Sequence, residues 1–123
     1  MAKYTFVVMS NPTTPGQEAE YNEWYNKIHI PDVLNVPGFV AAQRFKLADA
    51  QFAGGKPAHR YLALYELETD DPMGSLKELQ KRVGTTDMFM SDAIDMKGLL
   101  AAMFTPVAER VLAKDVQRPS RAA

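Results

Sequence analysis

The chain has 123 residues, of which 46% are hydrophobic and 24% charged, and its formal net charge at pH 7 is -1. This length supports one domain with a sizeable core, and the interspersed charges offer no basic surface for nucleic acid or an anionic membrane. The absence of cysteine excludes disulfides, thiolate nucleophiles and Cys-rich zinc sites. The N-terminal apolar run is too short for a membrane span and too strand-like for a signal peptide, so we expect a cytoplasmic protein.

The first two elements are a strand and a helix. Residues 4–9, YTFVVM, are β-branched and aromatic, and they end at the Pro- and Gly-containing run SNPTTPG. Residues 17–28 predict a helix that ends before Pro31, because a proline ring clashes with a preceding helical turn. One face of this helix has i, i+3, i+4, i+7 spacing and consists of Tyr21, Trp24, Tyr25 and Ile28.

An antiparallel hairpin and a second helix follow. Residues 39–48 and 60–68 both read as strands, and the loop between them has a Gly-Gly tip, so the two strands are expected to pair. Residues 70–83 place a proline near a helix start and apolar residues at helical spacing.

The C-terminal region predicts a last strand and a tail. Residues 85–98 indicate a short helical excursion, and residues 99–112 a strand in which Pro106 marks an edge or a bulge. We therefore expect one domain over residues 1–112 and a loose or partner-docked polar tail over residues 113–123.

The element order βαββαβ predicts an α+β, ferredoxin-like fold with a four-stranded antiparallel sheet and both helices on one face. The strands do not alternate apolar and polar residues as a half-covered sheet would. Tyr61, Ala63 and Tyr65 share one side of the third strand, and Leu62 and Leu64 share the other. Because two helices cover only one face, we expect a homodimer built sheet to sheet.

The stretch EYNEWYNKIHIPDVLNVPGFVAAQRF, residues 20–45, resembles the N-terminal signature of the dimeric α+β barrel superfamily, close to its EthD-like branch. The resemblance implies a pocket for a small apolar ligand between the sheet and its helices or loops, and chemistry that usually needs no metal. The superfamily includes lyases, isomerases, monooxygenases and haem enzymes. The strand-rich C-terminal half of this chain has no histidine suited to be a haem axial ligand, so we expect no cofactor.

The predicted catalytic group is His29. Tyr21, Tyr25 and His29 are spaced i, i+4, i+8 and form one stripe if the helix persists, and Asp32 follows in the turn. Histidine can exchange a proton near neutral pH, and Tyr25 or Asp32 could orient its ring. In the alternative interpretation the aromatic residues, with Trp24, are core, and His29 and Asp32 cap the helix end.

Four further polar residues are candidates for contacts with a ligand. Asn11 could hydrogen-bond a substrate or serve only as a turn residue. Arg44 could bind a carboxylate or phenolate, or form a salt bridge with Glu66 or Glu68. Tyr61 and Tyr65 share a strand face and could line the barrel interior.

The sequence also offers two aromatic residues, a second histidine and a group of methionines as possible parts of a site. Tyr21 and Trp24 are further candidates for substrate binding. His59, at the end of the glycine loop, is expected to face solvent. A methionine group could wall an aromatic-ligand pocket or serve as core; its members are Met88, Met90, Met96 and Met103.

The sequence lacks GxGxxG in a βαβ context, a P-loop, HExxH and GxSxG, so nucleotide, phosphate-transfer, zinc-hydrolase and serine-hydrolase mechanisms have no support. The remaining prediction is a cofactor-independent lyase or isomerase that uses acid/base chemistry on a small aromatic or apolar catabolic intermediate. The alternatives are a non-enzymatic ligand-binding accessory protein of a catabolic operon and a cofactor-free monooxygenase.

Overall fold

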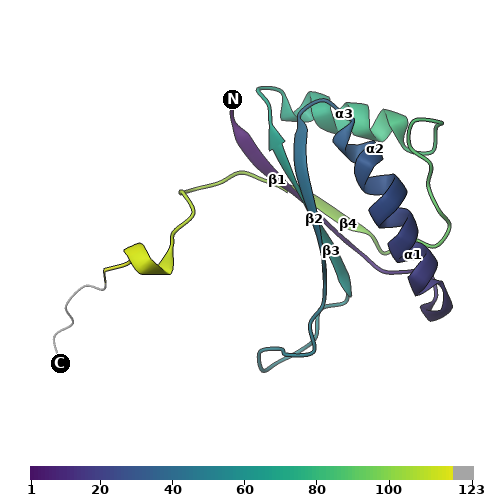
Figure 1. The fold of residues 1–123 in the computed structure, drawn as a ribbon, viewed down its shortest axis with the longest axis horizontal. Helices are drawn as coiled ribbons and strands as arrows, with labels where there is room; N and C mark the ends of the chain where they lie inside the picture. The colour runs from purple at the N-terminus through teal and green to yellow at the C-terminus, as the bar shows by residue number, and fades with distance from the viewer. Residues whose placement is uncertain (118–123) are drawn as a thin grey trace.

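The computed structural model describes residues 1–117 and contains one four-stranded sheet with its helices on one face (Figure 1). The strand order is β2-β3-β1-β4, and every neighbouring pair is antiparallel. This arrangement confirms the predicted ferredoxin-like βαββαβ fold. The strands are β1 (Lys3–Ser10), β2 (Phe39–Lys46), β3 (Tyr61–Glu68) and β4 (Leu100–Phe104).

The first helical segment follows a short 3-10 turn, Pro15–Gln17, and contains α1 (Glu18–Trp24), a π-helical turn (Tyr25–His29) and α2 (Ile30–Leu34). The prediction that the helix ends before Pro31 is therefore wrong. In the π turn the backbone N–H of Ile30 donates to the carbonyl of Tyr25, five residues earlier. Pro31 then stands in the first turn of α2, where its missing N–H and fixed φ are tolerated.

The π turn also changes which residues the helix buries. Ile28 was predicted to belong to the apolar face, but it is 42% exposed. His29 is buried instead, together with Tyr21 and Tyr25. The reason is geometric: an α-helix would return to the buried face at the seventh residue after Tyr21, whereas the wider π turn delays that return by about one residue.

The second helix, α3 (Pro72–Arg82), confirms the prediction for residues 70–83. The Asp71 carboxylate caps its start by accepting a hydrogen bond from the Gly74 N–H at 2.9 Å. The Ser75 hydroxyl donates to the Pro37 carbonyl at 2.8 Å, which ties α3 to the turn before β2. At this crossing Gly38 has φ 98°, and a Cβ there would overlap the Ser75 hydroxyl, so only glycine fits.

The core fills the space between the sheet and the two helical segments. Phe6, Tyr65 and Phe39 pack ring against ring at its centre, with centroid separations of 6.0–6.2 Å. The short helical excursion predicted for residues 85–98 is wrong, because the chain there forms turns and an isolated bridge between Pro12 and Ile94. The backbone of this segment is held by bonds to the end of β1, including Thr13 N–H to the Ala93 carbonyl at 2.7 Å.

The last strand is shorter than the predicted residues 99–112, since β4 ends at Phe104, two residues before Pro106. Proline cannot donate a hydrogen bond to a strand ladder, and residues 105–117 instead leave the body as an exposed arm (Figure 1). The arm contains one 3-10 turn, Ala113–Asp115. The tail predicted from residue 113 begins within this arm, and its last part, residues 118–123, lies outside the described residues.

Between residues 1 and 117 the structure contains no helix that is both long and apolar enough to cross a membrane.

Candidate functional site

A cavity of about 430 Å³ lies between the helix-covered face of the sheet and α2 and α3. Its lining is apolar except for three side chains, those of His29, Tyr65 and Gln80. No lysine, arginine or carboxylate among residues 1–117 lines it. The apolar residues come from strands, helices and the segment between α3 and β4: Phe6, Val8, Val33, Leu76, Leu79, Val83, Met90, Met96, Leu99 and Ala101.

His29 enters this cavity from the π turn with its ring fixed by two aromatic neighbours. The indole of Trp24 stacks on the imidazole, with the ring centroids 4.7 Å apart and the planes 23° from parallel. The ring of Tyr25 meets it edge to face at 5.1 Å. The His29 Nδ1 atom is buried and has no hydrogen-bond partner among residues 1–117. A buried polar atom in this state costs stability unless a ligand supplies the missing partner.

The environment of His29 favours its neutral form. Burial lowers the pKa of the imidazole to about 4, and the positive charge of Arg44 acts in the same direction. At pH 7 the ring is therefore uncharged, with one nitrogen free to accept a proton and the other able to donate one.

Tyr65 projects into the same cavity from β3. Its hydroxyl is buried and, like His29 Nδ1, has no partner within the part of the chain that the structure describes. Burial raises the pKa of Tyr65 well above its usual range, and the neighbouring Tyr25 hydroxyl raises this pKa further. The two hydroxyls do not form a hydrogen bond with each other. Burial likewise raises the pKa of Tyr25 to about 12. Tyr65 thus keeps its proton and can donate a hydrogen bond to a ligand oxygen.

Arg44 lies behind Tyr25 rather than in the cavity. Its guanidinium is 4.2 Å from the centroid of the Tyr25 ring and donates to the side-chain oxygens of Asn26 and Asn22, at 2.8 and 3.0 Å. Neither predicted role is seen: Arg44 does not line the cavity, and within residues 1–117 it forms no salt bridge with Glu66 or Glu68. It supports the ring that contacts His29.

Tyr21 and Tyr61 belong to satisfied networks outside the cavity. The Tyr21 hydroxyl lies 2.6 Å from the buried Ser10 hydroxyl. The Tyr61 hydroxyl donates to the Glu18 carboxylate, which also pairs with Arg60 at 2.9 Å. These contacts, the Tyr61 hydrogen bond first among them, lower the pKa of Glu18 to about 2. Both tyrosines therefore position the helix on the sheet.

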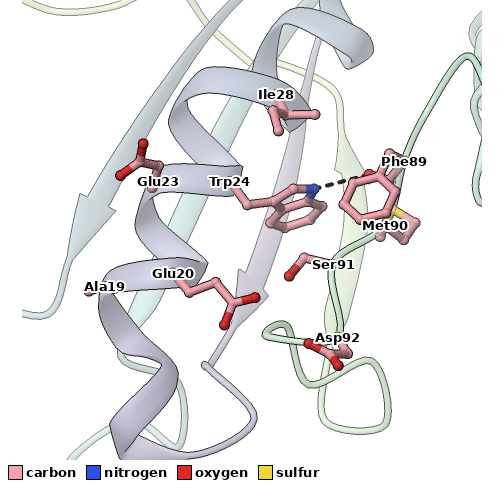
Figure 2. Close-up of a pocket in the computed structure, with 9 residues that line it drawn as sticks. All are labelled: Ala19, Glu20, Glu23, Trp24, Ile28, Phe89, Met90, Ser91 and Asp92. Carbon is pink, nitrogen blue, oxygen red and sulfur yellow. Dashed lines mark hydrogen bonds between the residues drawn. The ribbon is translucent and has the colours of Figure 1, made fainter.

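Trp24 stacks on His29 and also lines a second hollow, on the surface. Its indole N–H donates to the Phe89 carbonyl at 3.0 Å, and its ring lines a surface groove between α1 and the segment at Phe89–Asp92 (Figure 2). Met90 lines both this groove and the His29 cavity. Glu20 and Glu23 line the groove from α1, the same helix as Trp24, and Asp92 lies across from them (Figure 2).

Three other predicted residues form no hydrogen bond with His29 among residues 1–117. Asn11 ties the hairpin loop to β1: its amide donates to the Ala58 carbonyl at 3.0 Å and its oxygen accepts from the Arg60 N–H at 2.7 Å. Asp32 is partly buried on α2, and among residues 1–117 its carboxylate makes no hydrogen bond to His29. His59 does not simply face solvent, because its Nε2 bonds to the Gly98 carbonyl at 2.6 Å.

The structure thus brings together His29, Tyr25, Trp24 and Tyr65 from the predicted set. Of the methionine group, Met90 and Met96 line the cavity. Gln80 was missed, because a polar residue on a helix carries no sequence signal of which way it faces. The π turn was missed as well, although a proline two residues after His29 is a reason to doubt a regular helix there.

The fold and the cavity define an α+β protein with a ferredoxin-like fold and one histidine in an apolar pocket. No family model and no curated protein matches the sequence. Among solved structures, the haem degrader MhuD from Mycobacterium tuberculosis is 15% identical with a TM-score of 0.56, covering 88% of this chain and 99% of that chain. A candidate monooxygenase from Shewanella loihica PV-4 is 13% identical with a TM-score of 0.53, covering 88% and 97%.

An ethyl tert-butyl ether degradation (EthD) family protein from Bacillus halodurans C-125 is also similar, at 14% identity and a TM-score of 0.49, covering 87% of this chain and 100% of that chain. At such low identities the comparisons show the fold alone. The chain shares its ferredoxin-like α+β fold with these solved structures, and its sequence predicts that fold.

MhuD is described with two haems bound in its active site, which raises the question of whether this cavity has the side chains to bind a haem. His29 could offer a ring nitrogen to an iron. A buried haem also carries two propionates, whose charges need cationic or hydrogen-bonding partners. Among residues 1–117 no lysine or arginine lines the cavity, so this lining does not fit a haem buried with its propionates.

Proposed function

We propose that this protein is a cofactor-independent enzyme, a lyase or isomerase, that uses His29 for acid/base chemistry on a small, uncharged, largely apolar molecule. One observation supports this proposal above the others. Among residues 1–117, the buried side-chain polar atoms without any hydrogen-bond partner are His29 Nδ1 and the Tyr65 hydroxyl, and both residues line the same cavity. Such groups are rare in folded proteins and are expected where a ligand completes them.

The chemistry follows from the protonation states of the two groups. Neutral His29 accepts a proton from a carbon next to a ligand carbonyl, and the Tyr65 hydroxyl donates a hydrogen bond to the carbonyl oxygen as negative charge develops there. If the imidazolium returns the proton to a different carbon, the product is an isomer. If a leaving group departs from the adjacent carbon, the product is that of an elimination. Both outcomes conserve atoms and electrons.

The lining restricts the ligand. Because no cationic side chain of the described residues lines the cavity, a buried carboxylate or phosphate would lose its hydration without gaining a partner there. We therefore expect the ligand to be an aromatic or alicyclic carbonyl compound without charge at its buried end.

The test needs no knowledge of the natural product. A panel of small aromatic and alicyclic ketones and lactones is incubated with the protein in D₂O, and hydrogen-deuterium exchange next to the carbonyl is followed by NMR. We expect catalysed exchange that falls by about 10²- to 10⁴-fold in His29→Gln, the usual contribution of a general base. A ligand that binds, shifts the resonances of Tyr65 and undergoes no exchange would show a binding protein of the accessory kind instead.

A cofactor-free monooxygenase is a second candidate, favoured by the structural similarity to the Shewanella loihica protein. In that reaction the same proton removal would produce a carbanion or phenolate that reduces molecular oxygen. Oxygen consumption in the presence of a bound phenol, with no added metal or reductant, would distinguish this activity from isomerisation.

We further propose that the protein is a homodimer paired through the sheet face that the helices leave uncovered. The strand registers place two rows across this face, which we call the open face, and both rows are apolar except for Gln43. One row is Phe45, Leu62, Met9 and Leu100, and the other is Gln43, Leu64, Val7 and Ala102. A continuous apolar surface of this kind is typical of a protein interface.

A further inference from the structure

The arm formed by residues 105–117 carries apolar side chains that the rest of the described chain does not cover. Val107 is 99% exposed and Val111 is 72% exposed, and Val116 is also exposed. The arm's backbone hydrogen bonds among residues 1–117 are local, within the turn at Ala113–Asp115. Burying such a residue stabilises a structure by about 1.5–3 kcal/mol, so several exposed apolar side chains on one extended arm suggest a docking segment.

The arm leaves the body on the side away from the helices (Figure 1). Thr5, Glu66 and Phe104 lie in register on the open face, and together with Val107 and Arg110 they border a cleft of about 1030 Å³ between the sheet and the arm. The arm therefore stands beside the space that a second sheet would occupy.

Symmetry determines where that second sheet would lie. If two sheets pack face to face about a two-fold axis parallel to their strands, the edge strand β4 of one copy lies over the opposite edge strand, β2, of the other. Since β2 and β4 run in opposite directions, their pairing across the interface is antiparallel. The arm that continues from Phe104 then runs beside β2 of the second copy and away from its own body.

From this geometry we propose that residues 105–117 dock on a second copy of the chain, so that two copies exchange arms across the sheet interface. The proposal rests on the homodimer proposed above and adds an interaction segment to it. Each arm would bury its valines against the other copy, which explains why the arm is apolar but extended. The exchange is reciprocal, as a two-fold interface requires.

The chain has no cysteine, so a single introduced thiol reports on one position alone. Val107→Cys and Val111→Cys place the thiol on the arm, and Phe52→Cys places it on the glycine loop, where Phe52 is 97% exposed. All three side chains are exposed in the single chain, so the folded structure tolerates the changes. The labelling rate with a thiol reagent is measured from nanomolar to high micromolar protein, beside the solution mass at each concentration.

We expect at least one arm thiol to lose its fast labelling as the dimer forms, while Phe52→Cys labels at the same rate throughout. Adding Phe45→Asp, which charges the open face, should restore fast labelling of the arm. A dimer whose two arm thiols both label as fast as Phe52→Cys would overturn the arm exchange and leave the sheet dimer standing. Slow labelling at every concentration, including in the Phe45→Asp protein, would show that the arm docks on its own chain, and a monomer at all concentrations would overturn both proposals.

Discussion

His29 combines a buried ring, a lowered pKa and a nitrogen without a partner, and this combination has a consequence for stability. The unfolded chain binds a proton on this histidine below a pKa of about 6.5, whereas the folded chain does so only below about 4. Between these values the unfolded state binds more protons, so the free energy of unfolding falls as the pH is lowered. The contribution of His29 is fully present above pH 6.5 and is lost toward pH 4.

We predict that the wild-type protein loses stability between pH 6.5 and pH 4, and that His29→Gln removes up to about 3 kcal/mol of this pH dependence. Urea denaturation at several pH values measures the difference. Arg44 contributes to the same effect through its charge, held behind the Tyr25 ring. Identical pH dependence in the two proteins would mean that the imidazole is not held neutral by its surroundings.

A Tyr65 substitution tests whether the buried hydroxyl of this residue destabilises the protein while contributing to its activity. Its hydroxyl has no partner in the described chain, so Tyr65→Phe removes an unsatisfied buried group and should leave the free energy of unfolding unchanged or raise it by about 1–3 kcal/mol. Activity should fall, because the donor to the developing oxyanion is gone.

Tyr61→Phe is the matched control on the same strand. The Tyr61 hydroxyl is bonded to Glu18 and accepts from the Asn22 amide at 3.1 Å, so its removal should destabilise the protein. If Tyr65→Phe were the more damaging of the two to stability, the Tyr65 hydroxyl would have a structural partner and the site would need another donor.

At the scale of elements, α3 forms one wall of the cavity and depends on its cap. We predict that Asp71→Ala lowers the free energy of unfolding by about 0.5–2 kcal/mol through loss of the bond to the Gly74 N–H. Asp70→Ala is the neighbouring control, since Asp70 is exposed and lies outside the helix. Equal midpoints of urea denaturation for the two variants would show that this cap contributes nothing.

The elements also show what sequence reasoning can reach. Runs of β-branched and aromatic residues and the 3.6-residue helical period are local signals, so the first three strands and α3 were predicted within a few residues, whereas the last strand ends eight residues before its predicted end. The π turn depends on how Pro31, His29 and the sheet are accommodated together, and no local pattern encodes that. Likewise, the side-chain contacts of Arg44 and Asp32 follow from helix rotation on the sheet. The sequence predicts a pocket role for His29, whereas the cavity that His29 shares with Tyr65 appears only when β3 and the helix are packed together.

For the whole molecule, the open face is the feature that the single chain leaves unexplained. Its row of Phe45, Leu62, Met9 and Leu100 crosses all four strands, and Phe45 and Leu100 remain exposed. Pairing two such faces removes these side chains from water, and a specific interface of this kind buries more than about 1,000 Å². We therefore predict a dimer in solution.

Phe45→Asp tests the dimer because it changes the open face without entering the core. The two-fold axis would bring both new carboxylates into one apolar interface, where unpaired charges are costly, so the variant should be a folded monomer by solution mass measurement. Phe52→Asp adds the same charge on the exposed loop and should remain dimeric. A wild-type protein that is monomeric at high micromolar concentration, or a Phe45→Asp variant as dimeric as Phe52→Asp, would show that the open face pairs with something other than a second copy.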